Sequence, residues 1–285
     1  MTTYRDRMTE HDLRAEIVRV SRLLWEKGFV AATDGNVSAR LGSDRIIITP
    51  SGFSKGFIEP EHLIVTDMDG KLIPSYERGR RDLRPSSEMP LHLEAYRQRP
   101  DVQAVVHAHP PITVAFTIAG ISLAQCVLPE VVVSLGSIQT TAYATPGTPE
   151  GAGVVSDLIR THDALVLDHH GAVTVGKTVF DAYMKMEKVE HTAEISMAAR
   201  QLGQVNLLPI EEVRKLIEKR RQALGLPATY ESEFCALCGA CGKGEDGGSA
   251  SGSASSSDES SVVDLDNDEI ARLVTQAVAR EMGTK

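Results

Sequence analysis

His107 and His109 are separated by a single residue in an apolar run, a spacing that suits the binding of one metal ion. The run 104–108 predicts a strand, and side chains on a strand alternate between its two faces. Both imidazoles therefore point to the same side, where two nitrogen atoms can share a divalent cation such as zinc. Two unrelated surface histidines would show the same spacing, so the pair alone does not decide between these interpretations.

A second pair, His169 and His170, follows the apolar run 164–167. A third imidazole from this segment would complete a set of three nitrogen ligands and leave one coordination position open for a substrate. Neighbouring side chains on an extended segment point in opposite directions, so only one of the two can face the metal. The pattern leaves the choice between them open.

The segment Pro-Ser-Ser-Glu at 85–88 begins a helical pattern and predicts a site for an anion. Serine hydroxyls and the free N–H groups of a first helical turn suit a phosphate, because the helix dipole favours negative charge there. Glu88 could be a metal ligand or a base, or an ordinary acidic residue of a first turn. Two glycine-containing turns, 34–38 and 49–52, could approach the same anion, although Gly, Asn and Ser are common turn formers.

The elements that must position these groups follow one another without a regular βαβ rhythm. Apolar runs bounded by Gly and Pro predict strands at 45–49, 63–66, 104–108, 131–135, 138–142, 164–167 and 172–175. Helical periodicity predicts helices at 9–27, 87–99, 149–161, 179–202 and 210–224. This order predicts an α/β domain in which helices cover a mixed or antiparallel sheet.

Composition limits the classes of function. With 285 residues and 42% hydrophobic content, the chain can form one large domain with a sizeable core, plus an appendage. A net charge of -9 argues against broad nucleic-acid binding, which needs a basic surface. No apolar run approaches the roughly 20 residues that span a bilayer, and the N-terminus lacks the apolar core of a signal peptide. We therefore expect a cytoplasmic protein that binds neither nucleic acid nor membrane.

Six segments, in this order, resemble the class II aldolase/adducin family, and within it the L-fuculose-1-phosphate aldolases most closely. The resemblance covers about residues 9–225, and the segments are TDGNVSARL, ITPSG, PSSE, AVVHAHP, YATPGT and LDHHGAVTVG. It implies a three-layer αβα domain with a mostly antiparallel central sheet. It also implies a homotetramer whose active sites lie at subunit interfaces.

The resemblance also implies roles for single residues. His107, His109 and His170 would bind Zn2+ or another divalent metal, with one ion per subunit. Glu88 would be a ligand in the empty enzyme and the proton-transferring base once substrate displaces it, whereas His169 would be structural. The pocket for the substrate phosphate would consist of Gly35, Asn36, Ser51, Gly52, Ser86 and Ser87.

The implied reaction is the cleavage of a deoxyketose 1-phosphate to dihydroxyacetone phosphate and lactaldehyde, as in fucose or rhamnose degradation. The substrate would be L-fuculose 1-phosphate or a close relative such as L-rhamnulose 1-phosphate. The metal would act as a Lewis acid for the enediolate left by C–C cleavage, and Glu88 would protonate that carbon.

One position departs from the family pattern. Several family aldolases place a tyrosine near the aldehyde half of the substrate, and Leu128 occupies that place here. A pentulose-phosphate 4-epimerase or a sugar-phosphate dehydratase of the same family is therefore an alternative. The three histidines and Glu88 argue against a non-catalytic scaffold like the adducin head.

The composition changes after the expected aldolase domain, 1–228. Residues 245–265 are rich in Ser, Gly and acidic residues and predict a flexible linker, and 266–282 predict a short amphipathic helix. A linker followed by such a helix resembles the encapsulation peptides of bacterial microcompartments. We hypothesise that the helix docks on a shell protein and places the enzyme inside such a compartment; an oligomerisation or disordered tail is the alternative.

Three cysteines lie between the domain and the linker, in the segment 229–244. Cys235, Cys238 and Cys241 are one thiolate short of a four-cysteine metal site, and no histidine follows them. A redox-sensitive cluster or a plain turn is therefore favoured over a complete metal site.

Overall fold

A seven-stranded sheet with the order β3-β2-β1-β4-β7-β6-β5 organises the chain in the computed structural model, which describes residues 8–73, 83–227, 230 and 234. The strands are β1 (Asn36–Leu41), β2 (Arg45–Ile48), β3 (Ile64–Asp67), β4 (Ala104–Ala108), β5 (Gln139–Thr140), β6 (Ala164–Leu167) and β7 (Gly171–Gly176). Five neighbouring pairs are antiparallel, and β5 runs parallel to β6. The expected α/β class is therefore confirmed, with a sheet that is mixed because of this one parallel pair.

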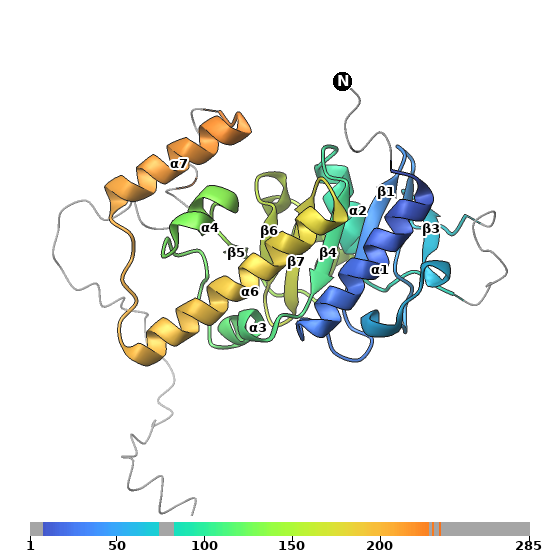
Figure 1. Ribbon diagram of the computed structural model, residues 1–285, viewed down its shortest axis with the longest axis horizontal. Coiled ribbons are helices and arrows are strands. Elements are labelled where there is room, and N and C mark those ends of the chain that lie inside the picture. Colours follow the sequence, from blue (N-terminus) through green and yellow to red (C-terminus); the bar gives the residue numbers. More distant parts are fainter. Residues whose placement is uncertain (1–7, 74–82, 228–229, 231–233, 235–285) are drawn as a thin grey trace, which may run out of the picture. The chain divides into compact units, whose positions relative to one another are not determined.

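Helices cover both faces of the sheet. They are α1 (Glu10–Glu26), α2 (Met89–Gln98), α3 (Pro111–Ile118), α4 (Pro129–Ser134), α5 (Pro149–Gly153), α6 (Val179–Leu202) and α7 (Ile210–Leu224), with short 3-10 helices η2 (Lys55–Phe57), η3 (Pro60–His62) and η5 (Leu158–Arg160). Figure 1 shows α1 and α6 lying across one face of the sheet. Among the described residues, no helix combines the length and the apolarity needed to cross a membrane.

Alternating side chains of the strands divide the interior into two cores. Ile47 and Val106 pack with residues of α1 and α6 on one face. Their chain neighbours Ile46 and Val105 pack with residues of α2 on the other face. Successive strand residues point to opposite sides, so a strand that is apolar throughout must be covered twice. The three-layer αβα arrangement follows from this double covering.

The first helix shows how local signals fix an element. Thr9 and Asp12 form a reciprocal capping box, in which the Asp12 N–H donates to Thr9 Oγ1 and the Thr9 N–H donates to Asp12 Oδ2. Gly28 follows with a positive φ of 72°, a conformation that ends a helix readily. The helix expected over 9–27 is thereby confirmed as α1.

Two predicted elements are wrong. The expected strand 131–135 belongs to the helix α4, because Pro129 stands in its first turn and Arg220, buried on α7, donates to the carbonyls of Val133 and Ser134 at its end. The expected helix 149–161 is broken into α5 and η5, because Gly151 and Gly153 weaken helical continuity. The strand β1 and the helix α3 were not predicted.

Several predicted segments lie outside the described residues. They are the linker 245–265, the amphipathic helix 266–282 and the three cysteines Cys235, Cys238 and Cys241. Within the segment 229–244, only Tyr230 and Phe234 are described.

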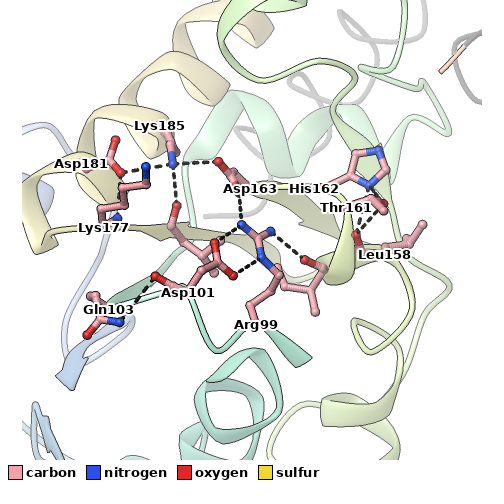
Figure 2. A network of polar contacts seen from close by, with 12 residues as sticks. Arg99, Asp101, Gln103, Leu158, Thr161, His162, Asp163, Lys177, Asp181 and Lys185 are labelled. Carbon is pink, nitrogen blue, oxygen red and sulfur yellow. Dashed lines mark hydrogen bonds and ion pairs between the residues drawn. The ribbon is translucent and has the colours of Figure 1, made fainter. Parts of the chain in front are cut away.

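A network of ion pairs joins the elements at one end of the central strands (Figure 2). Asp163 accepts from Arg99 at 3.0 Å and from Lys185 at 2.9 Å, and Lys185 also contacts Asp181. Burial alone would raise the pKa of Asp163, but Lys185 and Arg99 outweigh it and hold that pKa below its usual range. The network ties the end of α2, the beginning of β6 and the first turns of α6 to one another.

We predict that Asp163→Asn lowers the free energy of unfolding by about 2 kcal/mol at pH 7, because Lys185 and Arg99 lose a largely buried counter-charge. A carboxylate with a depressed pKa in the folded state stabilises above its unfolded pKa of about 3.9 and loses this contribution as pH falls through the folded value. The difference between wild type and variant should therefore be full at pH 7 and shrink below about pH 4. Urea denaturation at several pH values measures it, and a pH-independent difference would contradict the ionic origin.

Candidate metal centre

Three neighbouring strands bring the predicted motifs to one end of the sheet. β4 lies between β1 and β7, and His107 is the register partner of Asn36 on one side and of Val173 on the other. The hairpin turn between β6 and β7 holds His170 directly before Gly171, beside the end of β4. A Cβ on Gly171 would meet the rings of His107 and His109, so only glycine permits this close approach. The site therefore lies where β4 ends and β1 and β7 begin.

The imidazoles of His107, His109 and His170 converge at this point. Their potential ligand nitrogens all lie within 4.8 Å of one another, and the Nε2 atoms of His107 and His109 are 3.0 Å apart. The backbone of His169 has a φ of 54°, and its half-exposed side chain contacts Asp168. Of the two neighbours between which the pattern did not decide, His170 thus faces the other two rings and His169 does not.

The electrostatics of the three rings fit a divalent cation. Burial lowers the pKa of His107 well below its usual range, lowers that of His109, and lowers that of His170 to about 4. All three rings are therefore neutral at pH 7 and each retains a free electron pair. The Nδ1–H of His107 donates to the Ala172 carbonyl at 2.9 Å, which leaves its Nε2 for a metal. The donor set suits zinc or a similar ion.

Two acidic residues that were not among the predicted site residues contact the histidine segment. Asp34 Oδ2 lies 3.7 Å from Nδ1 of His109, on the side of that ring away from His107. Glu190, buried on α6, accepts from the N–H groups of Ile112 and Thr113 at the start of α3, directly after the histidines. Asp34 could have been found because it is the first residue of the glycine turn 34–38, whereas the contact of Glu190 follows only from long-range packing.

Glu88 stands at the N-cap of α2 and lines the same small pocket as His170. Within the described residues, the group of potential metal ligands consists of the three histidines and does not include this carboxylate. Burial raises the pKa of Glu88, and a hydrogen bond from the Gly147 backbone opposes that shift only in part. A carboxyl with a raised pKa beside the histidines is suited to taking up and returning a proton.

The residues expected to bind phosphate come from three loops that meet. Asn36 Nδ2 donates to Ser86 Oγ at 3.0 Å, and the Ser51 N–H donates to the Arg84 carbonyl at 2.9 Å. Pro50 and Pro85 form an isolated bridge, which places the turn with Ser51 and Gly52 beside Ser86 and Ser87. Gly35 precedes Asn36 at the start of β1. All six predicted residues therefore belong to one cluster of loops.

Lys55, which the sequence did not indicate, connects two of these loops. Its buried ammonium group donates to the carbonyls of Thr33 and Phe53 at 3.0 and 2.6 Å. Burial lowers the pKa of Lys55 to about 8, although Asp34 opposes the shift. The side chain thus fixes the turn before Gly35 to the turn after Gly52.

We predict that Gly35→Ala destabilises the protein by about 3 kcal/mol, because it combines a positive φ with overpacking. Gly35 has a φ of 71°, and an added Cβ would lie 2.5 Å from Val30 Cγ1 and 3.0 Å from the His107 carbonyl oxygen. Gly52→Ala is the matched control, since its φ is 78° but nothing lies within 4 Å of the added atom. It should cost only about 1 kcal/mol of backbone strain. If thermal denaturation showed the same loss of stability in Gly35→Ala and Gly52→Ala, the packing argument would be wrong.

Comparison with known proteins places this geometry in a family context. Residues 15–197 match the family described as Class II Aldolase and Adducin N-terminal domain. An L-fuculose phosphate aldolase from Methanococcus maripaludis is 34% identical over 181 residues, which cover 64% of this chain and 94% of the relative. A 3-oxo-tetronate 4-phosphate decarboxylase from Haemophilus influenzae is 31% identical over 192 residues, which cover 66% of this chain and 88% of the relative. A solved L-fuculose 1-phosphate aldolase superposes with a TM-score of 0.66 at 27% identity, covering 74% of this chain and 97% of that one.

Proposed function

This chain belongs to the class II aldolase and adducin family, and we propose that it is a zinc-dependent aldolase that cleaves a deoxyketose 1-phosphate to dihydroxyacetone phosphate and lactaldehyde. The substrate is L-fuculose 1-phosphate or a close relative such as L-rhamnulose 1-phosphate. The observation that carries the proposal is the convergence of three neutral imidazoles beside a carboxyl of raised pKa. The relative from Methanococcus maripaludis supports the choice of substrate class.

His107, His109 and His170 would hold the divalent metal. Once bound, that ion would supply Lewis-acid stabilisation of negative charge on the substrate. The chain itself supplies orientation, since the Ala172 carbonyl fixes the ring of His107 and Asp34 lies beside the ring of His109. The Ala172 carbonyl thereby leaves the lone pair on Nε2 of His107 directed toward the other two rings.

Glu88 would move the proton that the reaction requires. Cleavage leaves a carbanion-like carbon on the phosphorylated product, and the protonated carboxyl of Glu88 would donate to that carbon. In the condensation direction the ionised carboxylate would remove the same proton. Burial favours the protonated form of Glu88, and the Gly147 N–H stabilises the ionised form. The side chain can therefore take up either form during the reaction.

Ser86, Ser87 and the two glycine turns would hold the substrate phosphate through hydroxyl and backbone N–H donors. Gly35 and Asn36 contribute one side of this pocket, and Ser51 and Gly52 contribute the other. A phosphate held there anchors the substrate at a fixed distance from the histidines. This anchoring would exclude sugars that lack the phosphate.

Leu128 stands at the N-cap of α4, where several family aldolases place a tyrosine. Its alkyl side chain cannot transfer a proton, so another group would have to accept the proton of the hydroxyl that becomes the aldehyde oxygen on cleavage. We propose that the enzyme is a homotetramer and that a neighbouring subunit completes the aldehyde half of the site. Docking of 266–282 on a microcompartment shell protein stays a prediction for a segment outside the described residues.

A second candidate function is decarboxylation of a related sugar-acid phosphate, which the relative from Haemophilus influenzae supports. An epimerase or dehydratase would use the same histidines and carboxyl. All of these reactions pass through a carbanion next to a carbonyl, so the shared residues do not distinguish them. The products do.

The deciding experiment incubates the metal-loaded protein with L-fuculose 1-phosphate and L-rhamnulose 1-phosphate and identifies the products by mass and by enzymatic detection of dihydroxyacetone phosphate. The expected result is one equivalent of dihydroxyacetone phosphate and one of lactaldehyde from at least one substrate. A stereoisomer of equal mass would establish an epimerase, and loss of water would establish a dehydratase. Release of carbon dioxide from a 3-oxo-tetronate 4-phosphate, with no cleavage of the ketose phosphates, would overturn the aldolase.

A further inference from the structure

His92 on α2 is completely buried, yet both of its ring nitrogens have polar partners. Nδ1 lies 2.6 Å from Ser38 Oγ, and Nε2 forms a short hydrogen bond with Asn36 Oδ1. Ser38 Oγ in turn lies 2.8 Å from the hydroxyl of Tyr96, which is also buried. A chain of polar groups therefore runs through the core beside β1 and ends at Asn36, one of the residues of the proposed phosphate pocket.

The direction of these hydrogen bonds follows from the chemistry of each group. Burial lowers the pKa of His92 to about 3, so the ring is neutral and carries one N–H. The amide oxygen of Asn36 only accepts, so Nε2 of His92 must carry that hydrogen and donate it. Nδ1 then accepts from the Ser38 hydroxyl, whose oxygen accepts from Tyr96.

This direction determines what Ser86 can do. With its oxygen bound to His92, Asn36 presents its amide nitrogen to Ser86 Oγ, 3.0 Å away. Ser86 Oγ also accepts from the Glu88 N–H at 3.2 Å. Both lone pairs of the hydroxyl are then occupied, and its hydrogen is free to be donated to an anion. In the reverse orientation, Asn36 would consume that hydrogen and a lone pair of Ser86 would face the anion.

We propose that His92 is a positioning residue for phosphate: as the Nε2–H tautomer it orients the amide of Asn36 and, through it, turns the hydroxyl of Ser86 toward the substrate phosphate. The inference rests on the proposed phosphate pocket but not on the identity of the sugar. It assigns His92 no contact with the substrate. Its effect should appear in phosphate affinity and not in the chemical step.

The first test measures the affinity of the full-length, metal-loaded protein for inorganic phosphate by calorimetry. His92→Phe should weaken phosphate binding about tenfold, because one charge-assisted donor is lost. It should raise KM for the sugar phosphate similarly while kcat changes by less than about twofold, and His92→Gln should restore part of the affinity through its amide donor. His162→Phe is the matched control, since His162 is also buried but is bonded to Ser137 and Leu158, and it should leave phosphate affinity unchanged.

A double-mutant cycle separates positioning from a general loss of structure. If His92 acts through Asn36, His92→Phe should have no further effect on phosphate affinity in an Asn36→Ala background. An additive further loss, or an unchanged affinity in the single variant, would overturn the proposal. Failure of the wild type to bind inorganic phosphate would overturn it as well, whereas phosphate binding without aldol cleavage would remove only the proposed function.

The wild-type protein offers a test that does not depend on any variant folding. Long-range proton–nitrogen correlation spectra of protein labelled with 15N-histidine report which ring nitrogen carries the hydrogen. His92 should have a protonated Nε2 and a bare Nδ1. A signal from the Nδ1–H tautomer would overturn the assignment of the chain of hydrogen bonds.

Discussion

His170→Ala should lose its bound metal and about three orders of magnitude in kcat/KM, because Lewis-acid stabilisation contributes several kcal/mol to such a transition state. The remaining pair, His107 and His109, would hold a divalent ion too weakly to retain it through purification. Elemental analysis of the purified protein and an assay with the ketose phosphates measure both losses. Circular dichroism should show an unchanged fold, since the replaced side chain lies in a hairpin turn and not in a core.

The neighbouring histidine is the control. His169 has a φ of 54° and a half-exposed side chain that contacts Asp168 and does not belong to the group of ligand nitrogens. Asparagine tolerates that backbone conformation better than alanine does. His169→Asn should therefore keep one metal per subunit and nearly full activity. If the two variants lost metal equally, the assignment of His170 as the ligand would be wrong.

Glu88→Gln should lower kcat by about 10^3 while the metal content stays at one ion per subunit, because proton transfer by a positioned group contributes on the order of 10^2 to 10^4. The most direct measurement is the exchange of hydrogen between dihydroxyacetone phosphate and deuterated water. That exchange needs only removal and return of one proton, so it should be lost in the variant even though binding is retained. Rapid exchange in Glu88→Gln would assign the proton to another group.

The pH dependence of this exchange shows whether the pKa of Glu88 is raised or lowered in the folded protein. Removal of a proton requires the ionised carboxylate, and burial raises the pKa of Glu88. The exchange rate should therefore fall as pH is lowered at a value above the usual pKa of a glutamate, about 4.3. Metal content is measured at each pH, so that loss of the ion is not mistaken for protonation of Glu88.

The long helices and the central strands could be predicted because their signals are local. The expected helices 179–202 and 210–224 and the strands 104–108 and 164–167 have the observed bounds. The segment 131–135 has the β-branched composition of a strand, yet it is helical because Arg220 from a distant helix binds the carbonyls at its end. A contact between residues 86 positions apart cannot be predicted from the local sequence pattern.

The strand β1 was missed for a different reason. Its residues Asn36, Ser38 and Arg40 alternate with apolar neighbours, which is a strand pattern, but polar groups usually indicate an exposed face. Here Asn36 and Ser38 are buried, because His92 and Tyr96 bond them inside the core. The alternation was visible in the sequence. The residues that satisfy the buried polar groups by hydrogen bonding lie more than 50 positions further along the chain.

Spacing alone paired His107 with His109, and the residues at 85–88 alone predicted an anion site. The choice of His170 and the full set of phosphate residues came from resemblance to a family. The structure brings His170 to that pair and brings together, at the end of β4, the three loops that are predicted to bind phosphate. Lys55 and His92, which hold these groups in place, were not predicted, because a buried polar residue is recognised only when its partner is known.

The central position of β4 has a consequence for how the enzyme acquires its cation. His107 is held by the strand ladder and by the Ala172 carbonyl, so the placement of its nitrogen depends on the sheet and not on a bound ion. Unlike small zinc domains, which unfold under chelation, this protein should survive treatment with a chelator and regain turnover when an ion is returned. Cobalt, manganese or nickel could then be substituted in one preparation, and the ion carried in the cell would reflect supply as much as affinity.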